Sequence, residues 1–186
     1  MQNLAKRVGF LCLSIALARG VAVSAEIESL RFSLDPAEFL NWVAGHSQSN
    51  DKGSILEMVP KGETVDNYTR ILTDISFSKA KTQYPAPEDI MKRLKESMLQ
   101  KCPNVVWHII EKIGKDVLYE WRPENCSARG SDGSPIPDQH NIVRIFEGKY
   151  NDFTLMYMRK TKELPAEERN QWLEVMREAK VVIENK

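Results

Sequence analysis

The three histidines of the chain, His46, His108 and His140, are the residues best suited to metal binding or proton transfer. No two of them have the short spacing typical of zinc ligands, and a His-Glu-x-x-His pattern is absent. His108 and Glu111 are three residues apart on an expected strand, so their side chains leave opposite faces. The sequence therefore predicts no metal site from a local motif, although a site assembled only in three dimensions stays open.

Motifs for covalent catalysis and phosphate binding are also missing. There is no Gly-x-Ser-x-Gly sequence, and the Gly130–Gly133 turn lacks the lysine and the following helix of a phosphate-binding loop. Carboxylates are plentiful, but a domain of this size offers carboxylate pairs by chance. One catalytic alternative stays open, a small cell-envelope hydrolase whose site assembles from His140, Glu120 and the Gly62–Tyr68 loop.

The most distinctive polar stretch is Lys61–Tyr68, with the sequence KGETVDNY. It has two interpretations. As a binding loop, it would contact a ligand or partner. As a structural connection, a glycine turn followed by Asp and Asn side chains bonded to nearby backbone joins two strands. The structural interpretation is favoured, and the candidate binding residues are Glu63, Asp66, Asn67, Tyr68 and His140.

Composition limits the class of protein. The chain has 186 residues, enough for one domain of ordinary size, and 42% of them are hydrophobic, enough to bury a core. Lysine and arginine together number 26, equal to aspartate and glutamate, so no general basic field points to nucleic acid. We expect a single folded domain with no nucleic-acid partner.

The first 25 residues have the pattern of a secretory signal peptide. Lys6 and Arg7 precede the uncharged apolar run Val8–Ala18, and Val23–Ala25 supplies small residues for cleavage. Arg19 ends the run before it reaches the roughly 20 residues that a membrane span needs. We therefore predict a signal peptide at 1–25, a mature domain at 26–186 without a transmembrane segment, and a periplasmic or secreted location.

Removal of this segment leaves two cysteines, Cys102 and Cys126. An even pair in an exported chain favours a disulfide. Two buried free thiols are a second interpretation. A thiol redox centre is a third, but it would normally have a Cys-x-x-Cys spacing, which is absent.

Hydrophobic periodicity predicts mainly strands, with two longer helices. A short helix is expected to start at Asp35, and the polar segment Gly45–Gly53 is expected to be a turn. The expected strands lie at 30–34, 54–59, 67–77, 105–112, 116–122, 141–147 and 153–159. The expected helices are Pro87–Cys102, with a stripe of Ile90, Met91, Leu94, Met98 and Leu99, and a last helix from Pro165, with a stripe of Trp172, Met176, Ala179 and Ile183. Short connections make neighbouring strands antiparallel, so we predict one α+β domain whose antiparallel sheet is covered by two amphipathic helices.

Residues 57–73 (EMVPKGETVDNYTRILT) resemble a family of exported proteobacterial proteins of unknown function, marked by a VP-x-GET-x-x-N-aromatic-T segment. Tyr68 stands where the motif has tryptophan and keeps an aromatic ring. Further similarities are Glu120-Trp121 with Cys126, Gln139-His140 through Arg144-Ile145, and Trp172. The resemblance implies an exported α+β domain, loosely similar to the α/β/α sandwich of photosystem extrinsic subunits. It implies no activity, cofactor or catalytic residues.

The sequence favours an exported, non-catalytic domain that binds a protein partner or a cell-envelope component. No cofactor is expected. Besides the hydrolase, one more alternative stays open, a carrier that holds an apolar small molecule between the sheet and a helix. A carrier would need a continuous apolar cavity of several hundred cubic ångströms.

Overall fold

The computed structural model describes residues 26–35, 40–82, 86–124, 126, 129, 133 and 135–185. The predicted signal peptide at 1–25 lies outside these residues, as does the segment 36–39 in the predicted short helix. The described elements are β1 (Glu26–Arg31), β2 (Trp42–Asn50), β3 (Gly53–Pro60), β4 (Arg70–Ser78), α2 (Pro87–Lys101), β5 (Val105–Ile113), β6 (Asp116–Pro123), β7 (His140–Glu147), β8 (Asn151–Arg159), α3 (Ala166–Glu178) and β9 (Lys180–Asn185).

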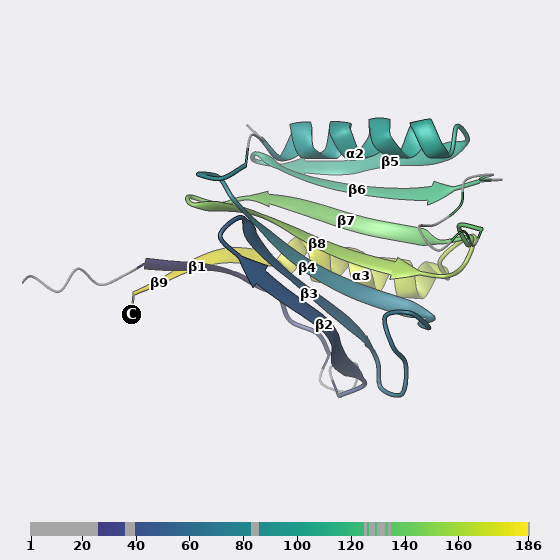
Figure 1. Ribbon diagram of the computed structural model, residues 1–186, viewed down its shortest axis with the longest axis horizontal. Coiled ribbons are helices and arrows are strands. Elements are labelled where there is room, and N and C mark those ends of the chain that lie inside the picture. Colours follow the sequence, from purple (N-terminus) through teal and green to yellow (C-terminus); the bar gives the residue numbers. More distant parts are fainter. Residues whose placement is uncertain are drawn as a thin grey trace, which may run out of the picture.

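Seven strands form one antiparallel sheet in the order β2-β3-β4-β8-β7-β6-β5, and β1 pairs with β9 in a separate two-stranded sheet (Figure 1). The predicted hairpins are confirmed. Gly114 joins β5 to β6 with φ of 63°, a conformation that suits glycine. At Gly148, between β7 and β8, a Cβ atom would lie 2.3 Å from the carbonyl oxygen of Asn151. The protein is thus a single α+β domain built mainly from antiparallel sheet.

The two helices pack on opposite faces of this sheet (Figure 1). Alternate residues of β6 and β7 point to opposite sides, so each strand contributes to both cores. The core beneath α2 consists of Ile90, Met91, Val117, Tyr119, Val143 and Ile145. The core on the α3 side is larger, and within it the rings of Tyr157 and Trp172 stack with their centroids 3.9 Å apart.

The prediction that the helices cover the sheet is not confirmed. α2 packs mainly over β5, β6 and β7, and β2 and β3 lie beyond its reach. Of its predicted apolar stripe, Ile90 and Met91 are buried, whereas Leu94 is 44% exposed. Neither helix in the described ranges has the length and apolar character needed to cross a bilayer.

The turn predicted at Gly45–Gly53 is wrong, because most of this segment belongs to β2. β2 is an edge strand whose residues after the first are all exposed, so it carries no apolar alternation that sequence analysis could detect. Gly45 lies at a β-bulge between Ala44 and His46. A glycine in a strand is typical of such a bulge.

The predicted last helix is too long. α3 ends at Glu178, and the following residues form β9, which pairs with β1. Ile183 is 45% exposed on this strand, although the sequence analysis placed it in a buried helical stripe. The β-branched run Val181–Ile183 suits a strand, and pairing with β1 overrides the helical period. The other three residues of the predicted stripe, Trp172, Met176 and Ala179, are buried.

β1 overlaps the predicted strand at 30–34 only at its last two residues. Its Glu28 carboxylate accepts hydrogen bonds from the backbone N–H groups of Tyr150 and Asn151, at 2.9 and 2.8 Å. These bonds join the β1–β9 sheet to the β7–β8 turn of the main sheet.

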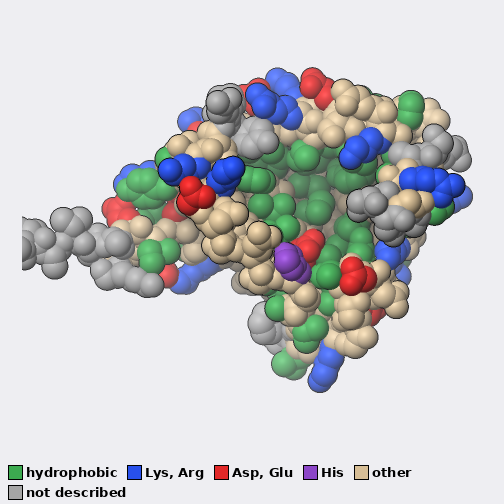
Figure 2. All heavy atoms as spheres, viewed as in Figure 1, with side chains coloured by type: hydrophobic (Ala, Val, Ile, Leu, Met, Phe, Trp, Pro, Cys, Tyr) green, Lys and Arg blue, Asp and Glu red, His purple; other side chains and the backbone are tan. Residues whose placement is uncertain are grey.

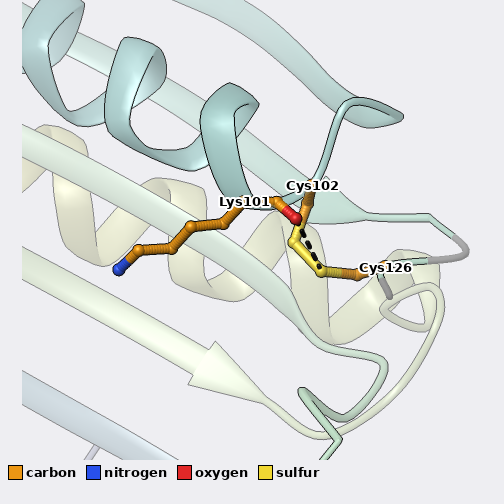
Figure 3. The surroundings of a disulfide bond; sticks show 3 residues. All are labelled: Lys101, Cys102 and Cys126. Carbon is orange, nitrogen blue, oxygen red and sulfur yellow. Dashed lines mark hydrogen bonds between the residues drawn. A yellow bond between two sulfur atoms is a disulfide. The ribbon is translucent and has the colours of Figure 1, made fainter. Parts of the chain in front are cut away.

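Cys102 and Cys126 form a disulfide, as predicted. Cys102 is the residue at the C-terminal cap of α2, and it is fully buried. The Sγ atom of Cys126 lies 3.8 Å from the Lys101 carbonyl oxygen at the end of the helix (Figure 3). The disulfide therefore attaches the C-terminal end of α2 to the segment that follows β6.

Removing this crosslink should destabilise the fold. Because it closes a loop with a sequence separation of 24 residues, the double substitution Cys102→Ala and Cys126→Ala should lower the free energy of unfolding by about 3 kcal/mol. Urea unfolding would measure the change. The reduced native protein is the control and should show a similar loss; equal stability before and after reduction would contradict the crosslink's role.

Candidate functional site

A groove of about 370 Å³ lies between α2 and the sheet. Its floor crosses β4, β8, β7 and β6, and one wall is the helix. Figure 2 shows apolar side chains gathered in a hollow on this face, with charged side chains around it. The residues that line the groove are Ile75, Phe77, Ile90, Arg93, Leu94, Ser97, Met98, Tyr119, Trp121, Val143, Thr154 and Met156.

The groove exists because α2 and the sheet do not close completely on each other. One row of cross-strand neighbours on this face runs from Tyr119 through Val143 and Met156 to Thr73. α2 packs over the Tyr119 end of this row, whereas Met156 stays partly exposed. Leu94 and Met98 on the helix line the resulting space, so apolar side chains from both walls face an open volume.

Aromatic rings border one end of the groove. Trp107 stacks on Tyr119 with the ring centroids 4.8 Å apart, and on Trp121 with the centroids 6.0 Å apart. Tyr119 and Trp121 also line the groove. This stack gives that end of the groove a flat, apolar boundary.

Two buried hydroxyl groups on this face lack hydrogen-bond partners among the described residues. Thr154 is 5% exposed and lines the groove, and Thr73 is 2% exposed on the neighbouring strand. A buried polar group without a partner usually costs about 1–3 kcal/mol. The Thr154 hydroxyl is thus a polar contact available to a molecule bound in an otherwise apolar space.

The Lys61–Tyr68 segment, predicted from sequence as a structural or binding loop, makes contacts within the protein. The Glu63 carboxylate accepts hydrogen bonds from the backbone N–H and the hydroxyl of Thr69, at 2.6 and 2.7 Å. The backbone N–H of Asn67 donates to the Thr64 carbonyl at 3.0 Å. Asp66 is exposed. These bonds hold the turn that joins β3 to β4.

Tyr68 is half-buried at the end of this turn. Its hydroxyl contacts Met158 Sδ at 4.0 Å, and the Lys160 ammonium lies 4.0 Å from its ring centroid. Burial, together with the charge of Glu57, raises the pKa of Tyr68. Tyr68 therefore packs against the sheet, and a binding role for this segment stays a prediction.

His140 lies on the α3 face of the sheet, in a cluster of polar side chains. The sequence analysis grouped His140 with Glu120 but did not predict the other members of this cluster. The Nε2 atom of His140 is 3.3 Å from a Glu120 carboxylate oxygen, and its Nδ1 accepts the backbone N–H of Leu164 at 3.1 Å. Arg169 donates two hydrogen bonds to Glu120, at 2.8 and 3.0 Å. His108 adds a contact at 3.1 Å from the exposed side.

The electrostatics of this cluster fix both protonation states. Burial by itself would raise the pKa of Glu120, but the hydrogen bonds from Arg169, His108 and His140 and the charge of Arg169 lower it to about 2. Burial lowers the pKa of His140 despite its bond to Glu120. The cluster is therefore an ionised glutamate beside a neutral histidine that donates through Nε2.

His140 and Glu120, two parts of the hydrolase alternative, lie within hydrogen-bond distance of each other, and they line a pocket of about 570 Å³ whose lining does not include the Gly62–Tyr68 loop. Both ring nitrogens of His140 are nevertheless occupied by protein groups, and a general base needs a free acceptor directed at its substrate. A glutamate with a pKa near 2 is also a weak base at neutral pH. The geometry favours a structural ion-pair cluster over proton transfer.

Within the residues that the structure describes, no group of three His, Cys, Asp or Glu side chains is placed to hold a metal ion. Comparison with models of known families and with curated proteins finds no match to this sequence. The resemblance to an exported proteobacterial family stays a prediction, and functional inference depends on the groove and the cluster themselves.

The Glu120 cluster should make stability fall in acid. Because the pKa of Glu120 is lowered from 4.5 to about 2 in the folded state, its contribution is complete above the higher value and is lost as the pH falls toward the lower one. Glu120→Gln should cost about 3 kcal/mol at pH 7 and much less near pH 2. Urea unfolding at both pH values would measure this.

Glu163 provides the matched control for that substitution. It pairs with Arg122 on the surface, with its side chain 74% exposed. Glu163→Gln should therefore change stability by less than about 0.5 kcal/mol at either pH. A Glu120→Gln effect that does not shrink in acid would contradict the assigned pKa.

Thr154→Val tests whether the groove hydroxyl lacks a partner. Removing an unpaired buried hydroxyl should raise the free energy of unfolding of the ligand-free protein by about 1 kcal/mol. The comparison is Thr69→Val, which removes a hydroxyl that donates to Glu63 and should lower stability. Chemical denaturation of both variants measures the change in the free energy of unfolding, which should be positive for Thr154→Val and negative for Thr69→Val. A destabilised Thr154→Val protein would show that the hydroxyl is paired.

Proposed function

We propose that this protein is an exported, non-catalytic binding domain that holds an apolar small molecule in the groove between α2 and the sheet. The observation that carries the proposal is the groove itself, which is lined mainly by apolar side chains. Its volume of about 370 Å³ lies within the range of small-molecule sites. The carrier alternative from the sequence analysis required an apolar cavity of several hundred cubic ångströms between the sheet and a helix.

The polar groups in the groove fit the same proposal. Ligand sites typically combine apolar walls with a small number of polar groups that fix the orientation of the ligand. Thr154 is buried, unpartnered among the described residues and part of the floor. A ligand with a polar atom would pair this hydroxyl and relieve its cost.

In this proposal α2 is the cover of the site. Its Leu94 side chain is exposed although it belongs to the apolar stripe, and a bound molecule would bury it. Burial of such area contributes roughly 25 cal/mol per Å². The disulfide at the C-terminal end of the helix keeps this cover attached to the sheet.

Export is part of the proposal and is supported by the signal-like pattern of residues 1–25 and by the Cys102–Cys126 disulfide. Disulfides persist mainly in oxidising compartments. A ligand in that setting would be an apolar component of the cell envelope or of its surroundings. The proposal needs no cofactor and no nucleic acid.

Binding of the uncharged dye N-phenyl-1-naphthylamine tests the proposal, because its fluorescence rises in an apolar environment. We expect saturable binding with one dye per chain. Ser97→Trp should weaken it at least about tenfold, because an indole ring at the groove lining occupies the space of the dye. Ser97 is exposed on α2, so the substitution should leave the fold intact.

Gln100→Trp is the matched control, because Gln100 is exposed on the same helix and is not among the lining residues. This variant should bind the dye as the native protein does. Absence of saturable binding, or equal affinity of the Ser97→Trp protein, would rule out the groove as the site.

A further inference from the structure

We infer that the ligand is an elongated molecule with a neutral carbonyl group inside its apolar chain, and that this carbonyl accepts a hydrogen bond from the Thr154 hydroxyl. This inference rests on the proposed function and specifies the class of ligand. It follows from the hydrogen-bonding state of the polar groups that line the groove, from the charges around them and from the shape of the floor.

Thr154 differs from the other polar residues of the groove. The lining residues with nitrogen or oxygen atoms in their side chains are Arg93, Ser97, Tyr119, Trp121 and Thr154. Among them, and within the described residues, only Thr154 has a buried polar atom without a hydrogen-bond partner. The residue is 5% exposed, so water has little access to its hydroxyl. A ligand that pairs with this hydroxyl therefore supplies a hydrogen bond that the protein itself does not.

The charged groups along α2 do not favour a charged ligand. Arg93 is the one charged residue in the described lining of the groove, and it already has an interaction partner within the protein. Asp89 and Glu96 lie four residues before it and three residues after it on the same helix, at spacings that make helix side chains neighbours. Both signs of charge therefore occur along this wall, which gives neither an anion nor a cation an advantage.

The floor of the groove also provides no counter-charge for an ionised group. In the described lining, every residue that comes from the sheet is uncharged. Two residues before Thr154 on β8, Asp152 pairs with Lys79 at 3.3 Å, and Asp152 is not part of the lining. Burying an ionised group without a counter-charge costs much more than burying a neutral polar group. The ligand group that pairs with Thr154 is therefore neutral.

A carbonyl oxygen suits the Thr154 hydroxyl better than a second hydroxyl does. The threonine hydroxyl carries one proton, and a carbonyl oxygen accepts it without bringing a donor of its own. Two hydroxyls bonded to each other leave one proton without an acceptor, and an unpaired donor in an apolar space is costly. The carbonyl can belong to a ketone or to an ester, since both present the same acceptor.

The shape of the floor places this carbonyl within an extended chain. The floor crosses β4, β8, β7 and β6 in that order, and Thr154 lies on β8 directly opposite Ile75 of β4. With strands about 4.8 Å apart, the path is roughly 14 Å long and Thr154 lies about one third of the way from its β4 end. The longer part of the chain would then lie over Val143 on β7 and Tyr119 on β6, which are apolar neighbours.

Displacement of N-phenyl-1-naphthylamine by dodecan-4-one and by 4-methylidenedodecane tests the inference. These molecules have the same carbon chain, and the second carries a methylene group in place of the carbonyl oxygen. Thr154→Val should weaken binding of the ketone about tenfold, because its carbonyl loses the hydrogen-bond donor. Binding of the hydrocarbon should change less than about threefold, because valine and threonine have nearly the same shape.

Propyl nonanoate extends the same test to esters. Its carbonyl lies at a similar position along a chain of similar length. The tighter ligand of the ketone and the ester identifies the kind of carbonyl that the groove prefers, and Thr154→Val should weaken the binding of that ligand about tenfold.

Thr73→Val is the matched control. Thr73 is buried on the neighbouring strand, and its hydroxyl also lacks a hydrogen-bond partner among the described residues. It is not among the residues that line the groove. This variant removes the same chemical group from the same face of the sheet, and it should bind the ketone as the native protein does.

Infrared spectroscopy of the bound ketone gives a second readout that needs no variant. A hydrogen bond lowers the stretching frequency of a carbonyl group. Dodecan-4-one bound to the native protein should therefore absorb at a lower frequency than the same ketone dissolved in dodecane. Equal frequencies would show that the bound carbonyl has no donor, and would overturn the inference.

The outcomes separate the two proposals. If the dye binds but dodecan-4-one does not displace it, or if Thr154→Val leaves the difference between ketone and hydrocarbon unchanged, the carbonyl ligand class is wrong and the proposed function stands. If the dye does not bind at all, the proposed function fails first.

Discussion

One amphipathic helix lies on a face of the sheet that is much wider than the helix. Seven strands about 4.8 Å apart span roughly 29 Å between the two edge strands, whereas a helix with its side chains is about 10–12 Å across. α2 can therefore cover only β5 to β7. At the other side of the face, the β3–β4 connection contributes Val65, which lies near Val59. The groove lies beside α2, over β6, β7, β8 and β4.

The two faces of the sheet differ in how completely they are packed. On the α3 face, Tyr157 stacks on Trp172, and Arg144 donates hydrogen bonds to the Met176 carbonyl and to Asp116, both at 2.7 Å. On the α2 face, Thr154 has no partner among the described residues and Leu94 remains exposed. The α3 face supplies most of the buried core, while the α2 face leaves apolar surface exposed.

The sequence predicted the hairpins, α2 and the start of α3 because each has a clear period and a clear stop signal. It missed β2, whose exposed edge position removes any apolar alternation, and β9, where strand pairing with β1 ends the helical stripe. It proposed a site between sheet and helix only as an alternative. The gap beneath Leu94 depends on the distance between α2 and the sheet. The apolar stripe of the helix predicts which side faces the sheet, but it does not predict this distance.

The candidate residues illustrate the same limit. Glu63 belongs to a polar loop in the sequence, and only the structure shows its carboxylate bonded to Thr69. His140 could be chosen from its chemistry, but the occupation of both its ring nitrogens depends on Glu120 and on the Leu164 backbone, which are distant in sequence.

Methyl NMR of the methionines provides the most direct test that the groove is the binding site. Met98 and Met156 line the groove, whereas Met176 belongs to α3 and is buried on the opposite face of the sheet. On titration with N-phenyl-1-naphthylamine, we predict shifts and intermolecular NOEs at the methyl groups of Met98 and Met156, with Met176 unchanged. Bound dye that perturbs Met176 and leaves Met98 and Met156 unaffected would contradict this account.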